Sequence, residues 1–181
     1  KDAGVDGFRI DTVKHVNTDF WQTFSPALLS HTRATGNKDF FMFGEIYDGN
    51  PAYLSTFTTT GKLQAALDFG FQGKALDFVK GGAATAMAGL YAADDYYTDA
   101  DSNAYSSPTF LGNHDMGRVA MMLKGSSATD AELMTRVRLA NTLMYLTRGQ
   151  PIVYYGDEQG FIGAGGDKDA RQDMFPSQVA S

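Results

Sequence analysis

The sequence predicts an α/β fold in which strands and helices alternate and the strands run parallel. Three observations predict it. Strand-like and helix-like segments alternate along the 181 residues. Residues 40–44 are a short apolar run, as expected of a strand covered on both faces. Three strand-like segments end in a carboxylate, at Asp11, Glu45 and Asp115, and parallel barrels place their catalytic groups at such strand ends.

The individual elements follow from the apolar pattern. Residues 5–11 are expected to form the first strand, and residues 18–35 a helix that Gly36 ends. In the clearest helix, residues 126–146, Thr129 and Glu132 have the spacing of a capping box. The remaining predictions are strands at 40–44, 65–71, 109–113 and 152–155, a helix at 83–93, a loop at 94–107 and an irregular tail at 160–181.

Composition excludes several classes of function. The net charge is −6 and no block of Lys and Arg occurs, so we expect no nucleic-acid partner. The chain has no Cys, which rules out disulfides, zinc thiolates and a thiol nucleophile. No apolar run reaches the ~18 residues of a membrane span, so we expect no membrane partner. A nucleotide-binding open sheet would suit the same alternation, but no Gly-rich phosphate loop follows the first strand.

Asp11 has the surroundings of a nucleophile. Glycoside hydrolysis is commonly performed by two carboxylates, one as acid/base and one as nucleophile or base. Side chains alternate across a strand, so Arg9 and Asp11 share one face. A neighbouring cation favours the ionised carboxylate that a nucleophile requires. Alone, each residue also has a structural interpretation, because Asp11 could cap a helix and Arg9 could form a structural ion pair.

Glu45 and Asp115 suit the two complementary roles. An acid catalyst needs a raised pKa, which other carboxylates and apolar walls such as Phe41 and Phe43 would produce for Glu45. Asp115 would be a third carboxylate that hydrogen-bonds the sugar and favours an oxocarbenium-like state. The joint occurrence of the three makes the catalytic interpretation much stronger than any one of them does.

Five short segments resemble the motifs of the α-amylase family of glycoside hydrolases. Residues 7–15 (GFRIDTVKH) resemble that family's nucleophile motif. Residues 43–45 resemble its acid/base motif, and residues 113–115 its third-carboxylate motif. Residues 149–151 and 155–158 resemble its last-strand motif, and the order along the chain is the order in the family.

The resemblance implies a (β/α)₈ barrel that this chain covers from about the fourth strand to the eighth. Residues 1–181 would then be a partial catalytic domain whose N-terminal strands are missing, since a whole barrel takes about 250 residues. It also implies a retaining mechanism on the α-1,4-glucosidic bonds of starch-like α-glucans, either polysaccharide or oligosaccharide. Such a polymeric substrate suggests an extracellular, secreted protein.

The resemblance also implies a role for each site residue. Asp11 would be the nucleophile, Glu45 the acid/base and Asp115 the transition-state stabiliser. Arg9 would support Asp11, and His114 would contact the sugar in the central subsite. Lys14 and His15 would contact the sugar chain on the leaving-group side. Independently of the resemblance, Tyr47 is a candidate for stacking on a sugar ring because it follows Glu45 by two residues.

The resemblance further implies a structural calcium ion. The backbone carbonyl of the residue that matches His15 often ligates it. One carbonyl falls short of the about 6–8 oxygens that calcium takes. We therefore expect the ion in a longer protein and not in this chain alone.

Other functions use the same motifs. A transglycosylase, a branching or debranching enzyme, or an α-glucosidase of the same family would carry the same three carboxylates. A catalytically inert carbohydrate-binding homologue tends to lose them, whereas Asp11, Glu45 and Asp115 are all present. The chain could also be inactive as a fragment whatever the longer protein does.

Overall fold

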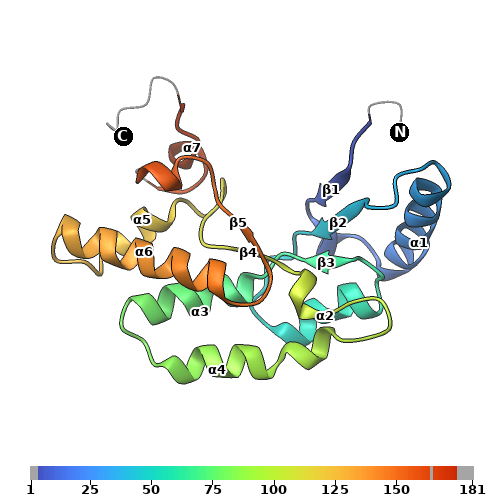
Figure 1. The fold of residues 1–181 in the computed structure, drawn as a ribbon, viewed down its shortest axis with the longest axis horizontal. Helices are drawn as coiled ribbons and strands as arrows, with labels where there is room; N and C mark the ends of the chain where they lie inside the picture. The colour runs from blue at the N-terminus through green and yellow to red at the C-terminus, as the bar shows by residue number, and fades with distance from the viewer. Residues whose placement is uncertain (1–3, 164, 175–181) are drawn as a thin grey trace. The chain divides into compact units, whose positions relative to one another are not determined.

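The computed structural model describes residues 4–163 and 165–174 (Figure 1). The chain folds into two compact units. The first comprises the residues up to Gly70 together with Leu90–Pro108. The second comprises Phe71–Gly89 and the residues from Thr109 onward. Residue 164 and residues 175–181 of the predicted tail lie outside the described residues.

The first unit is built on a parallel three-stranded sheet with the order β1-β2-β3 (Figure 1). The strands are β1 (Gly7–Ile10), β2 (Phe41–Gly44) and β3 (Ala65–Ala66). Helix α1 (Thr18–Ala34) connects β1 to β2, and helix α2 (Pro51–Thr59) connects β2 to β3. Parallel strands require such crossovers, so this unit confirms the predicted parallel α/β arrangement.

The register of β1 and β2 positions the candidate site. Gly7 pairs with Phe41 and Ile10 with Gly44, so the two strands end at the same level. The next residue of each strand, Asp11 in one and Glu45 in the other, therefore leaves the sheet at the same edge. The Glu45 amide donates to the Ile10 carbonyl (2.8 Å), which extends the pairing to the candidate catalytic residue.

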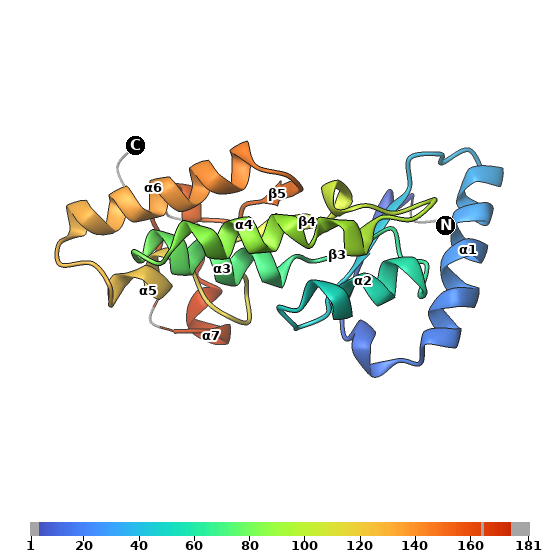
Figure 2. The same cartoon turned by 90° about the horizontal axis from the view of Figure 1, so that it is seen from below.

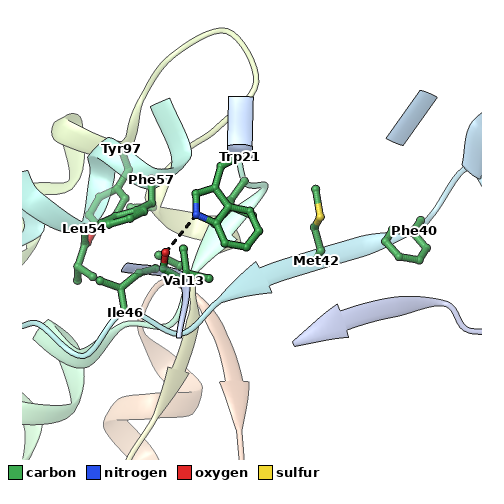
Figure 3. Packing of buried hydrophobic residues seen from close by; sticks show 11 residues of the cluster. Val13, Trp21, Phe40, Met42, Ile46, Leu54, Phe57 and Tyr97 are labelled. Atoms are coloured by element: carbon green, nitrogen blue, oxygen red, sulfur yellow. Dashed lines mark hydrogen bonds between the residues drawn. The ribbon is translucent and has the colours of Figure 1, made fainter. Parts of the chain in front are cut away.

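A hydrophobic core fixes the segments on either side of these strand ends (Figure 3). Trp21 of α1 donates from Nε1 to the carbonyl of Val13 (3.1 Å), which ties the helix to the 3₁₀ turn Val13–His15 (η1). A Cβ at Gly44 would lie 2.8 Å from Val13 Cγ2, so the residue before Glu45 must be glycine for the core to close. The buried members are Val13, Trp21, Phe40, Met42, Ile46, Leu54, Phe57, Leu63, Ala66, Tyr97 and Ala104.

The second unit contains the clearest helix, α6 (Asp130–Leu146), which α5 (Val119–Lys124) packs against (Figure 2). The capping box is confirmed: Thr129 Oγ1 accepts a hydrogen bond from the Glu132 amide (3.1 Å), and Glu132 Oε2 accepts one from the Ala128 amide (2.8 Å). The apolar residues Leu133, Val137, Ala140 and Met144, which recur every three or four residues, are buried along α6.

The other elements complete the chain. Strand β4 (Pro108–Phe110) neighbours β5 (Gln150–Ile152). The remaining elements are α3 (Phe69–Val79), α4 (Ala84–Ala92), α7 (Asp167–Ala170) and the 3₁₀ turns Asp94–Tyr97 (η2), Ala104–Ser106 (η3) and Asp157–Gln159 (η4). Within the described residues, no helix combines the length and the apolar character that crossing a membrane requires.

Several predicted boundaries were wrong. The predicted strand 65–71 is a strand only at Ala65–Ala66, and helix α3 begins at Phe69. A short apolar run does not distinguish a strand from a buried helix, which explains the error. The predicted strand 152–155 is instead Gln150–Ile152. Helices α2 and α5 were not predicted, and neither was α7, which lies in the tail expected to be irregular. Helix α2 nevertheless carries a recognisable start: Asn50 Oδ1 accepts from the Ala52 amide (3.0 Å), ahead of Pro51 at the first position.

Candidate active site

Asp11 lies in a turn directly after β1, with its side chain exposed to solvent. The following residue, Thr12, has φ 55° and ψ 28°, a left-handed conformation that a β-branched residue rarely adopts. The Val13 amide then donates to the Glu45 carbonyl (3.3 Å), which connects this turn to the end of β2. Such local strain is tolerated where the surrounding structure fixes it, and it clusters at functional sites.

Glu45 is the buried member of the pair and is held by an ion pair. Arg9 Nη2 donates to Glu45 Oε2 at 2.5 Å, and Glu45 is only 9% exposed. Alternation along β1 predicted that the Arg9 guanidinium lies beside Asp11. In the structure it binds the carboxylate of the neighbouring strand, because Arg9 pairs in register with Phe43 and its side chain reaches across the strands.

Lys14 and Tyr47 come together from the segments after β1 and β2. The Lys14 ammonium donates to the Tyr47 carbonyl (2.9 Å) and lies 5.8 Å from the centroid of the Tyr47 ring. Tyr47 is 61% exposed, and its ring packs against Phe69 with centroids 5.0 Å apart. A ring supported on one side and open on the other can stack on a sugar. His15 is exposed at the end of η1, beside Lys14.

His114 and Asp115 lie in the second unit, on a tight turn after β4. Residues Asn113 and Gly117 close the turn with two backbone hydrogen bonds of 3.1 and 3.0 Å. Asn113 Oδ1 also accepts from the amides of Asp115 (3.0 Å) and Met116 (2.7 Å). Asp115 is therefore presented on a rigid turn, with its side chain half exposed and His114 Nε2 3.3 Å from its Oδ2.

Arg171 contacts Asp115, and the sequence analysis missed it. Its Nη2 lies 3.5 Å from Asp115 Oδ1 and 2.9 Å from Asp167 Oδ1. The Asp167 amide donates to the Asp115 carbonyl (3.2 Å). No hydrophobic period marks residues 160–174, so the sequence offered no signal for this contact.

The predicted calcium ligand of this chain is the His15 carbonyl, at the end of η1. Calcium takes several oxygen ligands, with carboxylates prominent among them. In the part of the chain that the structure describes, no three His, Cys, Asp or Glu side chains gather around a point that a metal could occupy.

Parallel strands joined by helices, with two carboxylates leaving the same edge, have the arrangement of a (β/α)₈-barrel glycoside hydrolase. The family model of the α-amylase catalytic domain matches residues 1–179. The chain belongs to the α-amylase family, and its fold is part of that family's barrel.

Individual relatives agree with this assignment. The α-amylase of Streptomyces lividans is 51% identical over 183 residues, a match that covers 99% of this chain and 20% of that protein. The cyclomaltodextrin glucanotransferase of Klebsiella oxytoca is 29% identical, and the match covers 87% of this chain and 27% of that protein. The chain thus spans about a fifth to a quarter of the length of these relatives.

Solved structures show the same fold. An Anoxybacillus α-amylase superposes with a TM-score of 0.82 at 28% identity, over 97% of this chain and 36% of that one. The Geobacillus thermoleovorans α-amylase, solved in complex with acarbose, gives a TM-score of 0.81 at 27% identity, over 97% of this chain and 37% of that one.

Proposed function

We propose that this chain is the second part of the catalytic barrel of a retaining hydrolase that cleaves α-1,4-glucosidic bonds in starch-like glucans. The register of β1 and β2 is the observation that carries the proposal, because it delivers Asp11 and Glu45 from adjacent strands at one level. Neighbouring strands lie about 4.8 Å apart. Retaining glycosidases place their two carboxyl groups about 5–5.5 Å apart, so adjacent strand ends suit a retaining pair.

The two carboxylates divide the chemistry between them. In the first step the Asp11 carboxylate attacks the anomeric carbon, the bond to the leaving oxygen breaks, and Glu45 gives that oxygen a proton. In the second step Glu45 takes a proton from water, whose oxygen attacks the anomeric carbon and frees Asp11. Arg9 holds the Glu45 carboxyl group in place between the two steps.

The other site residues bind the sugar in this proposal. Asp115 and His114 contact the ring whose bond is cleaved, and Asp115 stabilises positive charge that develops there. Lys14, His15 and Tyr47 contact the sugars on the leaving-group side. In this proposal the chain contributes one ligand, the His15 carbonyl, to a structural calcium ion. The whole protein is secreted, because its polymeric substrate lies outside the cell.

A transferase is the second candidate, because cyclomaltodextrin glucanotransferases are among the relatives. In that reaction a sugar hydroxyl replaces water in the second step. The 51% identity to an α-amylase, against 29% and 30% to these transferases, favours hydrolysis.

Product analysis decides between the candidates. The complete catalytic domain is incubated with soluble starch, and reducing ends, linear oligosaccharides and cyclic products are measured. We expect reducing ends to rise together with linear maltooligosaccharides. Cyclic or newly linked products without reducing ends would assign transfer instead, and cleavage of maltose but not starch would assign an α-glucosidase. We expect no activity from residues 1–181 alone, because the partial barrel lacks strands that complete the site.

Replacing Tyr47 by Ala is expected to lower kcat/KM on oligosaccharides by about tenfold, which corresponds to about 1.4 kcal/mol. The reason is that the supported, open face of the ring is lost. The matched control is Tyr105→Ala, since Tyr105 is also an exposed tyrosine but lies in η3. Equal kinetics for Tyr47→Ala and the control would remove Tyr47 from the site.

A further inference from the structure

Arg118 is the largest side chain that the structure buries completely, with 0% exposed. Arginine is almost never fully buried unless it is paired, because removing the charge from water is costly. The residue directly follows the 113–117 turn that presents Asp115. Packing alone therefore does not explain why the charged side chain of Arg118 is buried.

The guanidinium is held by three hydrogen bonds to the chain that follows β5. Nη1 donates to the Tyr155 carbonyl (2.5 Å) and to Asp157 Oδ1 (3.0 Å), and Nε donates to Gln172 Oε1 (2.6 Å). Three aromatic rings surround it, with centroids 4.8, 5.0 and 5.1 Å from Cζ, which offers a cation favourable electrostatic contact. The rings belong to Tyr154, Tyr155 and Phe161.

Asp157 is an unusual partner because it is itself buried. Burial raises the pKa of Asp157 to about 6, although the hydrogen bond and charge of Arg118 act in the opposite direction. The Arg118 guanidinium therefore favours the ionised form of the Asp157 carboxyl group. Residues 155–158 belong to the last-strand motif, and the motif alone indicated no chemical role for them.

Residues 154 and 155 are also bonded to residues 170–172, which include the residue that contacts Asp115. Tyr154 Oη donates to the Ala170 carbonyl (2.9 Å), and Tyr155 Oη donates to the Gln172 carbonyl (2.8 Å). Arg171 lies between Ala170 and Gln172 in the sequence, and its Nη2 lies 3.5 Å from Asp115 Oδ1. Arg118 thus connects the turn that carries Asp115 to the segment that contacts the Asp115 carboxylate.

We propose that Arg118 is the positioning residue of Asp115: its caged guanidinium fixes the 113–117 turn to residues 154–161 and 172. Arg118 acts through Asp115 and does not touch the sugar. The proposal rests on the proposed function for its effect on catalysis, but its effect on the turn is independent of any activity. Arginine is required because its planar fork makes the separate hydrogen bonds and stacks against rings, which a lysine ammonium cannot reproduce.

The test combines Arg118→Lys with Asp115→Asn in the complete catalytic domain. Arg118→Lys alone is expected to lower kcat on maltooligosaccharides by about 10²-fold, the cost of misplacing a group by about 1 Å, with little change in KM. When Arg118→Lys is added to Asp115→Asn, it is expected to lower kcat by no more than about a further twofold, because the effects of substituting residues that act as a unit are not additive. Arg138→Lys, an exposed arginine of α6, is the matched control and is expected to leave kcat unchanged.

Hydrogen exchange gives a readout that does not depend on activity. The amides of Asp115 and Met116 are bonded to Asn113 Oδ1, so their exchange should accelerate in Arg118→Lys while that of helix α6 stays unchanged. If Arg118→Lys fails to fold, Gln172→Ala removes only the Nε contact and should give the same pattern with a smaller loss. Unchanged exchange in the turn, or equal losses of kcat in both backgrounds, would overturn the proposal. Acceleration in the turn of a domain without glycosidase activity would support it and refute only the proposed function.

Discussion

Replacing Asp11 by Asn is expected to lower kcat on starch and maltooligosaccharides by about 10⁴-fold or more, with KM little changed. An amide cannot form the covalent bond to the anomeric carbon, while the turn after β1 and the core around Val13 are untouched. The measurement is the initial rate of reducing-end release by the complete catalytic domain, with folding checked by circular dichroism.

The matched control for this variant is Asp39→Asn. Asp39 is an exposed carboxylate that lies two residues ahead of β2, away from the carboxyl edge of the sheet. We expect this variant to have the activity of the parent. Residual activity of Asp11→Asn within tenfold of the parent would show that Asp11 is not the nucleophile.

Replacing Glu45 by Gln is expected to lower kcat on glucans by about 10²–10⁴-fold, the usual contribution of a general acid/base. Glutamine keeps an oxygen that can accept the hydrogen bond from Arg9, so the change removes the proton and little of the geometry. The first step should be nearly normal with a glucosyl fluoride, because fluoride leaves without needing a proton. The measurement is the ratio of kcat/KM values for the two substrates in parent and variant.

Added azide provides a second criterion for Glu45. Azide needs no base to attack the glycosyl intermediate, so it should accelerate turnover of glucosyl fluoride by Glu45→Gln and yield a glucosyl azide. If kcat/KM falls equally for glucans and for the glucosyl fluoride, and azide does not restore turnover, Glu45 acts only through the structure of the site.

The strand ends that carry the site could be predicted from the sequence because each has a strong local signal. Apolar residues lead directly to Asp11 and to the Gly44-Glu45 pair, and α6 has both a capping box and a regular stripe of buried apolar residues. The pairing of Arg9 with Glu45 could not be predicted in this way. It depends on the register of two strands separated by helix α1, and alternation within β1 alone pointed to Asp11.

Other features had weak or misleading local signals. Helix α3 contains Gly70 and Gly73, and each glycine costs about 1 kcal/mol in a helix relative to alanine. Burial of residues such as Phe71 overrides that preference. The contacts of Arg118 with Tyr155 and of Arg171 with Asp115 had no local signal, since these partners lie 37 and 56 residues apart in the chain.

The central claim is that Asp11 forms a covalent bond to the sugar while Glu45 serves as acid/base. The most direct measurement treats the Glu45→Gln catalytic domain with a glucosyl fluoride, stops the reaction with acid, and locates the added mass in the digested protein by mass spectrometry. The account predicts one glucosyl group on the peptide that contains Asp11, attached at that residue. A label on another carboxylate, or an unlabelled protein that releases sugar of inverted anomeric configuration, would contradict it.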